Sequence, residues 1–179
     1  MVLLNGAGSA GKSSIAKALQ EVARRSFLHV EMDAFLDMLP ARSEGRPEGL
    51  VFEAQVEQGR RVVAVHSGPL VERALAGMRG AVAALAAAGN DLIVDEVMLG
   101  AELQDYRRRL AGTRLLLVGI FAPLGVLEER ERLRGDREIG LARWQYPRVH
   151  EGIDYDLMVD SSLETPRQCA RRIQKTFDL

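Results

Sequence analysis

The chain has 179 residues, 47% of them hydrophobic, and its 24 basic and 25 acidic side chains leave a net charge of −1. A near-neutral chain lacks the strong field that attracts nucleic acid or an anionic membrane surface, so we expect neither as a partner. The length is typical of one domain and allows burial of about 70% of the surface that the unfolded chain exposes. We therefore expect a single domain over residues 1–179.

The single cysteine, Cys169, excludes an internal disulfide and a cysteine-rich metal site, and its helical surroundings favour a small core residue. The N-terminal segment lacks the basic region and long apolar core of a signal peptide. The longest apolar run, residues 81–88, is too short to span a bilayer. A single cysteine does not report the compartment, and the other two features predict a cytoplasmic protein.

The chain opens with a short apolar strand (residues 2–5), a glycine-rich turn and a helix that runs to about Arg24. The turn fits G-x-x-x-x-G-K-[ST], the Walker A phosphate loop, and lies between a strand and a helix as that motif requires. Glycines let successive N–H groups turn inward, and these donors form an anion site with the helix N-terminus. The residues expected to bind ATP are Gly6, Ala7, Gly8, Ser9, Ala10, Gly11, Lys12, Ser13 and Ser14.

Two side chains of this loop have separate expected roles. Lys12 should reach the β- and γ-phosphates, and the Ser13 hydroxyl should bind Mg²⁺. The same glycines also fit G-x-G-x-x-G, the dinucleotide fingerprint, with Asp33 about where a ribose-binding acid would lie. A dinucleotide site has no use for the Lys-Ser pair, so we favour the phosphate loop.

The next segments are a second strand over residues 27–32, which ends at Asp33, and a short helical turn over residues 34–39 before Pro40. His29 lies within this strand, and we interpret it as a strand-pairing residue. His66 and His150 have no spacing that supports a metal site, and we assign them no role.

Residues 41–67 differ in character from the rest of the chain. The apolar runs 51–56 and 61–65 flank Glu57-Gln58-Gly59-Arg60, a pattern that predicts a hairpin with a glycine turn. An excursion at this point suits a cover over a substrate, and a loop without function is an equally good interpretation.

The remaining chain alternates helices with strands. We expect helices over residues 70–88, 101–110, 123–134, 142–149 and 164–177, and strands over 92–94, 115–121 and 156–160. Such alternation predicts a mainly parallel sheet of five strands between two helical layers. The alanine-rich helix has a slim face that could pack on the sheet or on a second copy, so a homo-oligomer stays open.

Acidic residues follow three of the predicted strands at the edge where an open α/β sheet binds its ligand: Asp33, Asp95 with Glu96, and Asp160. Asp33 is the candidate general base, because a carboxylate can orient an acceptor hydroxyl and take its proton. A helix N-cap is the alternative role for Asp33. Asp95 ends an apolar strand as a Walker B acid does and should assist Mg²⁺, and Glu96 beside it could orient water or substrate.

Arginines cluster in residues 130–142, after the predicted helix. Helical spacing places Arg130, Arg134 and Arg137 roughly on one side, where a lid could close over the γ-phosphate and stabilise its charge. The alternative is a solvated helix end with an i,i+4 pair between Glu128 and Arg132. The phosphate loop upstream favours the lid.

With these motifs assembled, the chain resembles the chloramphenicol phosphotransferases over nearly its whole length. The matching segments are Leu4-Asn5-Gly6 with Ser9-Ala10-Gly11-Lys12-Ser13, Met32-Asp33-Ala34-Phe35 with Met38-Leu39-Pro40, Asp95-Glu96-Val97-Met98-Leu99-Gly100, Arg134-Gly135-Asp136-Arg137, and Val149-His150-Glu151-Gly152 with Tyr155-Asp156. Glu96 departs from the pattern, because the family carries aspartate there.

The resemblance implies a three-layer P-loop nucleoside triphosphate hydrolase fold of the nucleotide/shikimate-kinase type. It also implies an ATP- and Mg²⁺-dependent kinase that phosphorylates a primary hydroxyl, as family members do with chloramphenicol to give antibiotic resistance. In that family the base maps to Asp33, the phosphate lysine to Lys12 and the lid arginines to residues 130–137. Two alternatives stay open: a kinase for a nucleotide, sugar or nucleotide sugar, and an ATPase switch that signals to a protein.

Overall fold

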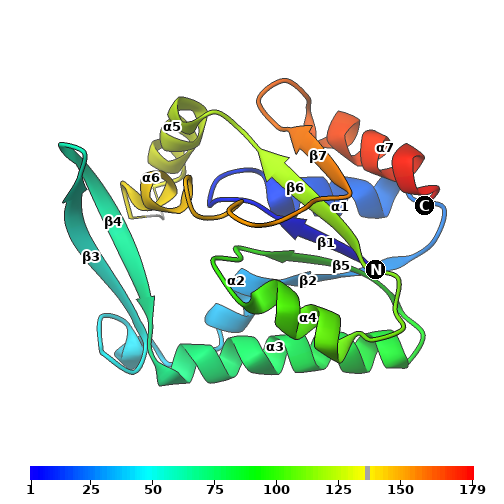
Figure 1. The fold of residues 1–179 in the computed structure, drawn as a ribbon, viewed down its shortest axis with the longest axis horizontal. Coiled ribbons are helices and arrows are strands. Elements are labelled where there is room, and N and C mark those ends of the chain that lie inside the picture. The colour runs from blue at the N-terminus through cyan, green and yellow to red at the C-terminus, as the bar shows by residue number, and fades with distance from the viewer. Residues whose placement is uncertain (136–137) are drawn as a thin grey trace.

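A computed structural model describes residues 1–135 and 138–179 and shows a sheet between two layers of helices (Figure 1). The strands are β1 (Val2–Asn5), β2 (Phe27–Glu31), β3 (Leu50–Glu57), β4 (Arg60–Ser67), β5 (Asp91–Glu96), β6 (Leu116–Phe121) and β7 (Leu157–Asp160). The helices are α1 (Lys12–Val22), α2 (Met32–Leu36), α3 (Pro69–Ala87), α4 (Glu102–Arg109), α5 (Leu124–Arg134), α6 (Leu141–Gln145) and α7 (Pro166–Phe177), with a 3-10 turn at Ala41–Ser43.

The main sheet has five strands in the order β2-β5-β1-β6-β7, and every neighbouring pair is parallel. This confirms the predicted architecture. Because the carboxyl ends of parallel strands share one edge, the loop after β1, helix α2 after β2 and the segment after β5 all begin at that edge. The register places Asp95 of β5 opposite both Leu4 of β1 and Glu31 of β2.

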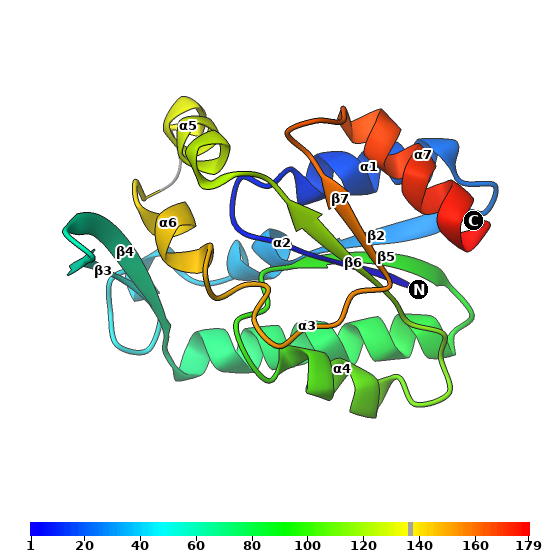
Figure 2. The same cartoon turned by 45° about the horizontal axis from the view of Figure 1, so that its top comes forward.

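Helices α1 and α7 cover one face of the sheet, and α3 and α4 cover the other, as Figures 1 and 2 show. Strand β1 is buried along its whole length, and Val2, Leu3 and Leu4 are apolar on both faces as this requires. Its side chains alternate: Val2 and Leu4 pack in the core beneath α1, whereas Leu3 packs in the core beneath α3. Cys169 of α7 is fully buried in the first of these cores, as predicted.

Strands β3 and β4 form a separate antiparallel hairpin, which confirms the predicted hairpin in residues 41–67. Gln58 and Gly59 at its tip both have positive φ, 50° and 73°, as the tight turns of hairpins require. The hairpin lies beside α6, and the N–H of Val63 donates to the carbonyl oxygen of Gly140 at 3.0 Å (Figure 1). It is therefore attached to the segment that follows α5.

Several element boundaries differ from the sequence prediction, and three of them bear on the site. Helix α2 begins at Met32 with Glu31 as its N-cap, so Asp33 lies inside the first turn and the N-cap alternative for Asp33 is wrong. Strand β5 extends through Glu96, and α6 ends at Gln145 rather than at 149. In the described part of the chain, no helix combines the length and apolar character needed to cross a bilayer.

A buried amide fixes the ligand-binding edge of the sheet. Asn5, at the end of β1, is fully buried and donates from Nδ2 to the carbonyl oxygen of Val149 and to the hydroxyl of Tyr155, both at 2.7 Å. Its Oδ1 accepts the N–H of Met98 at 2.8 Å. One side chain thus joins the start of the phosphate loop to two segments that are distant in sequence.

Replacing Asn5 with alanine should lower the free energy of unfolding by about 2–4 kcal/mol, because at least two buried backbone groups lose their partner. Urea unfolding followed by circular dichroism measures this change. Asn90→Ala is the matched control, since the Asn90 amide makes one exposed bond to the carbonyl oxygen of Leu85. Equal losses in the two variants would contradict the importance assigned to Asn5.

Candidate active site

The phosphate loop occupies the bend between β1 and α1. A Cβ on Gly6 would lie 2.5 Å from the carbonyl oxygen of Ile120, so only glycine allows the loop to leave the strand this close to β6. Ser9 and Gly11 have left-handed φ values of 62° and 89°, and Gly11 is the N-cap of α1. Backbone in this conformation curls around a concavity lined by N–H groups, which suits phosphate.

The lysine of the motif is folded onto this loop. Lys12 is only 8% exposed, and its Nζ donates to the carbonyl oxygens of Gly6 at 2.9 Å and Ala7 at 3.1 Å. A buried ammonium group held beside a ring of N–H donors offers a strong positive site for an anion. The loop residues named from the sequence therefore lie together.

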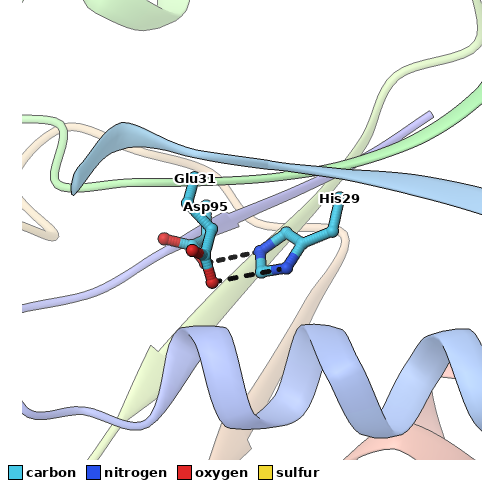
Figure 3. Close-up of side chains that lie close together, drawn as sticks. All are labelled: His29, Glu31 and Asp95. Atoms are coloured by element: carbon cyan, nitrogen blue, oxygen red, sulfur yellow. Dashed lines mark hydrogen bonds and ion pairs between the residues drawn. The ribbon is translucent and has the colours of Figure 1, made fainter. Parts of the chain in front are cut away.

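A cluster of three ligand-type side chains lies where β2 meets β5. Figure 3 shows the His29 ring pointing toward Asp95 and Glu31, with Nε2 2.7 Å from Oδ2 of Asp95 and Nδ1 3.5 Å from Oε1 of Glu31. The three ligand atoms lie within 4.8 Å of one another, a spacing that could hold a cation. Asp95 and Ser13, the predicted Mg²⁺ ligands, line one cavity.

The contact between His29 and Asp95 was not predicted from the sequence. His29 does lie in a paired strand, opposite Ile93, but its side chain also contacts Asp95. The i,i+2 spacing of His29 and Glu31 placed both on one face of β2, and only the strand order shows that Asp95 is their neighbour. His29 thus belongs to the surroundings of the predicted metal site.

Glu96 has a different environment from Asp95 next to it. Its Oε2 accepts the Tyr106 hydroxyl at 2.6 Å and its Oε1 accepts Nη1 of Arg79 at 2.8 Å. Arg79 in turn donates from Nε to Asp105 at 3.0 Å. Burial raises the pKa of Glu96 to about 7, and the bonds from Tyr106 and Arg79 limit the rise. The structure therefore gives Glu96 partners in α3 and α4, and both of its oxygens are engaged.

Two cavities meet at Asp33. An inner cavity of about 230 Å³ is lined by loop residues including Lys12 and Ser13, by Asp33 and Asp95, and by the hairpin side chains Leu50, Phe52, Val65 and Ser67. A wider outer cavity of about 800 Å³ shares Asp33 and Arg134 with it. A carboxylate in the wall common to both cavities can face a phosphate on one side and an acceptor on the other.

The predicted lid arginines have different surroundings. Arg130 donates to the Ser161 hydroxyl at 2.9 Å and to the Ser161 carbonyl oxygen at 2.7 Å, so it lies beside the phosphate loop, with Ser9 O at 3.5 Å. Arg134 lines both cavities, and Arg137 falls outside the described residues. The Glu128 carboxylate pairs with Arg143, whereas Arg132 donates from Nε to the Glu128 carbonyl oxygen at 3.3 Å. The expected ion pair between Glu128 and Arg132 is therefore wrong.

The end of the arginine-rich segment 130–142 is anchored from α5. Glu131 is buried, and its carboxylate accepts the N–H groups of Gly140 at 2.8 Å and Ala142 at 2.7 Å. At the other end of α6, Oε1 of Gln145 accepts the N–H of Gly8 at 2.7 Å. Sequence reasoning missed both residues, because neither lies in a recognised motif.

The Glu96 carboxyl should make stability depend on pH. Its pKa is raised from 4.5 in the unfolded chain to about 7 in the folded chain, so the folded state binds more protons between these values. The free energy of unfolding should therefore fall as pH rises through this window, by on the order of 1 kcal/mol per pH unit. Glu96→Gln should lose this slope in urea titrations at pH 5, 6 and 7. Parallel slopes in wild type and variant would contradict the assignment.

The family model of chloramphenicol phosphotransferase-like proteins matches residues 1–178. A proposed O-phosphotransferase of Mycobacterium tuberculosis strain H37Rv is 31% identical over 183 residues, which cover 99% of this chain and 81% of that protein.

Solved structures agree on the fold. A sugar kinase from Janibacter sp. HTCC2649 has a TM-score of 0.68 at 18% identity, over 99% of this chain and 93% of its own. Shikimate kinase from Acinetobacter baumannii in complex with shikimate has a TM-score of 0.60 at 14% identity, over 99% of this chain and 92% of its own. The fold is thus that of the P-loop kinases. With the family match over almost every residue, the chain belongs to the chloramphenicol phosphotransferase-like family and is an enzyme of the phosphotransferase class.

Proposed function

We propose that the enzyme transfers the γ-phosphoryl group of Mg·ATP to a primary hydroxyl of a small molecule, as a chloramphenicol 3-O-phosphotransferase does. The observation that carries the proposal is the position of Asp33, in the wall shared by the phosphate-loop cavity and the outer cavity. The donor set fits a polyphosphate: a loop of N–H groups that only Gly6 permits, closed by a buried lysine.

The loop and the neighbouring strand ends supply the groups that hold Mg·ATP in this proposal. Lys12 and the loop N–H groups hold the phosphates, while the Ser13 hydroxyl and the Asp95 carboxylate are the Mg²⁺ ligands. Mg²⁺ prefers oxygen ligands, so His29 serves better as the partner of Asp95 than as a ligand. Bound Mg²⁺ would neutralise charge that develops between the phosphates.

Asp33 activates the acceptor. Its carboxylate accepts the proton of the hydroxyl as the hydroxyl oxygen bonds to the γ-phosphorus and the bond from that phosphorus to the leaving ADP oxygen breaks. Arg130 beside the loop and Arg134 in the cavity wall stabilise the transferred negative charge. Arg137 would act with them if the lid closes as the sequence indicates.

Apolar side chains that line both cavities suggest the type of acceptor. Leu50 and Phe52 of the hairpin and Leu36 of α2 place apolar surface beside Asp33 in both cavities. Such surface suits an alcohol with an apolar body, and chloramphenicol is the first compound to test. A kinase for a sugar or nucleotide is the alternative that this test separates.

The test measures ADP release from Mg·ATP with and without chloramphenicol, together with the mass of the recovered drug. Stimulated ADP release and an added phosphoryl mass would support both the chemistry and the acceptor. ADP release stimulated only by another alcohol would support the kinase activity but exclude chloramphenicol as its acceptor. Slow ADP release that no hydroxyl compound stimulates would favour a nucleotide-binding switch instead.

Asp33→Asn should lower kcat by about 100-fold or more, because an amide cannot accept the hydroxyl proton. The affinity for ATP, measured by calorimetry, should stay within about two-fold of wild type, since the loop is untouched. Asp154→Asn is the matched control, an exposed acid outside the two cavities. Normal turnover in Asp33→Asn would show that Asp33 is not the base.

A further inference from the structure

Gln145 approaches the phosphate loop from α6. Its side chain is 5% exposed, and Oε1 accepts the N–H of Gly8 at 2.7 Å across 137 residues of sequence. A backbone N–H can only donate, so this bond fixes which end of the carboxamide faces Gly8. The Nε2 group, with its two hydrogens, must therefore point in another direction.

That Nε2 group is a buried donor without a protein acceptor. Over residues 1–135 and 138–179, the structure shows no oxygen that accepts a hydrogen bond from it. Buried polar groups in proteins are almost always paired, and an unpaired one is costly. The side chain lines the inner cavity together with Gly8, Lys12 and Asp33, so the donor is available to a ligand there.

The position of Gly8 along the loop indicates which phosphate lies nearest to Gln145. The lysine of a Walker A loop reaches the β- and γ-phosphates. In this chain that lysine is Lys12, and its ammonium group contacts the carbonyl oxygens of Gly6 and Ala7. Gly8 is the next residue, so Gln145 lies at this end of the loop rather than at the helix end, where Ser13 and Ser14 begin α1.

We propose that Gln145 is a phosphoryl-contacting residue, whose Oε1 holds the Gly8 N–H while its Nε2 donates a hydrogen bond to an oxygen of the γ-phosphoryl group. The proposal rests on the proposed ATP-dependent function. It also explains why a loop N–H that could bind phosphate is instead occupied: the carboxamide replaces that donor with one that extends further into the cavity.

Helix α6 holds Gln145 firmly in this position. The Glu131 carboxylate accepts the N–H groups of Gly140 and Ala142 at the start of α6, and the Gly140 carbonyl oxygen accepts the N–H of Val63 in the hairpin. The γ-phosphoryl contact is therefore attached to the two elements, α5 and the hairpin, whose residues line the outer cavity. A donor placed in this way needs little reorganisation during transfer.

The experiment compares binding of Mg·ADP with binding of Mg·AMP-PNP, a non-hydrolysable ATP analogue, by calorimetry. Gln145→Glu keeps the oxygen that accepts the Gly8 N–H but replaces the donor with a second, negatively charged oxygen. Gln145→Met removes both bonds at similar volume. We expect AMP-PNP affinity to fall at least 10-fold in Gln145→Met and further in Gln145→Glu, with ADP affinity in Gln145→Glu changed by less than about three-fold.

Gln104→Glu on α4 makes the same charge change at an exposed position and should leave both affinities unchanged. Thermal melting checks that each variant is folded, and if Gln145→Met does not fold, Gln145→Glu alone decides. An unchanged ratio of the two affinities in Gln145→Glu would overturn this inference and leave the proposed function standing. Absence of nucleotide binding in the wild-type protein would overturn both.

Discussion

The hydrogen bonds of Asn5 are the constraint on which the site depends. A parallel sheet brings its strand ends to one edge, but it does not fix the loops that continue beyond that edge. Asn5 fixes them by joining Met98 after β5 and Val149 after α6 to the last residue of β1. The Tyr155 hydroxyl, bonded to Asn5 and to His150, extends the same network. The phosphate loop therefore starts from a rigid point.

Two adjacent acids on β5 show how environment sets the role of a side chain. Strand alternation sends Asp95 to the face covered by α1, where it meets His29 and lines the inner cavity. Glu96 turns to the opposite face, where Tyr106 and Arg79 occupy its oxygens. One acid thus remains available to a cation, whereas the other binds α3 and α4 to the sheet.

The proposed acceptor side of the site is built from elements outside the main sheet. To the outer cavity the hairpin supplies Leu50 and Phe52, and α6 supplies Leu141. These elements are joined by the bond from Val63 to Gly140 and by the ion pair of Arg148 with Glu57 at 2.8 Å. In the proposed function, phosphate binding thus comes from the strand–loop–helix unit of β1 and α1, and the shape of the acceptor cavity comes from the attached hairpin.

The sequence by itself determined the phosphate loop, the five-stranded sheet, the hairpin and the family, because glycine spacing and apolar periodicity are local signals. It also indicated that Asp33 and Asp95 would lie near each other, since acids at strand ends converge in a parallel sheet, and both line the inner cavity. Only the tertiary structure decided the partners: His29 with Asp95 across 66 residues, Glu96 with Arg79, and Gln145 with Gly8 across 137 residues. Such contacts follow from strand order and helix packing, which leave no periodic trace in the sequence.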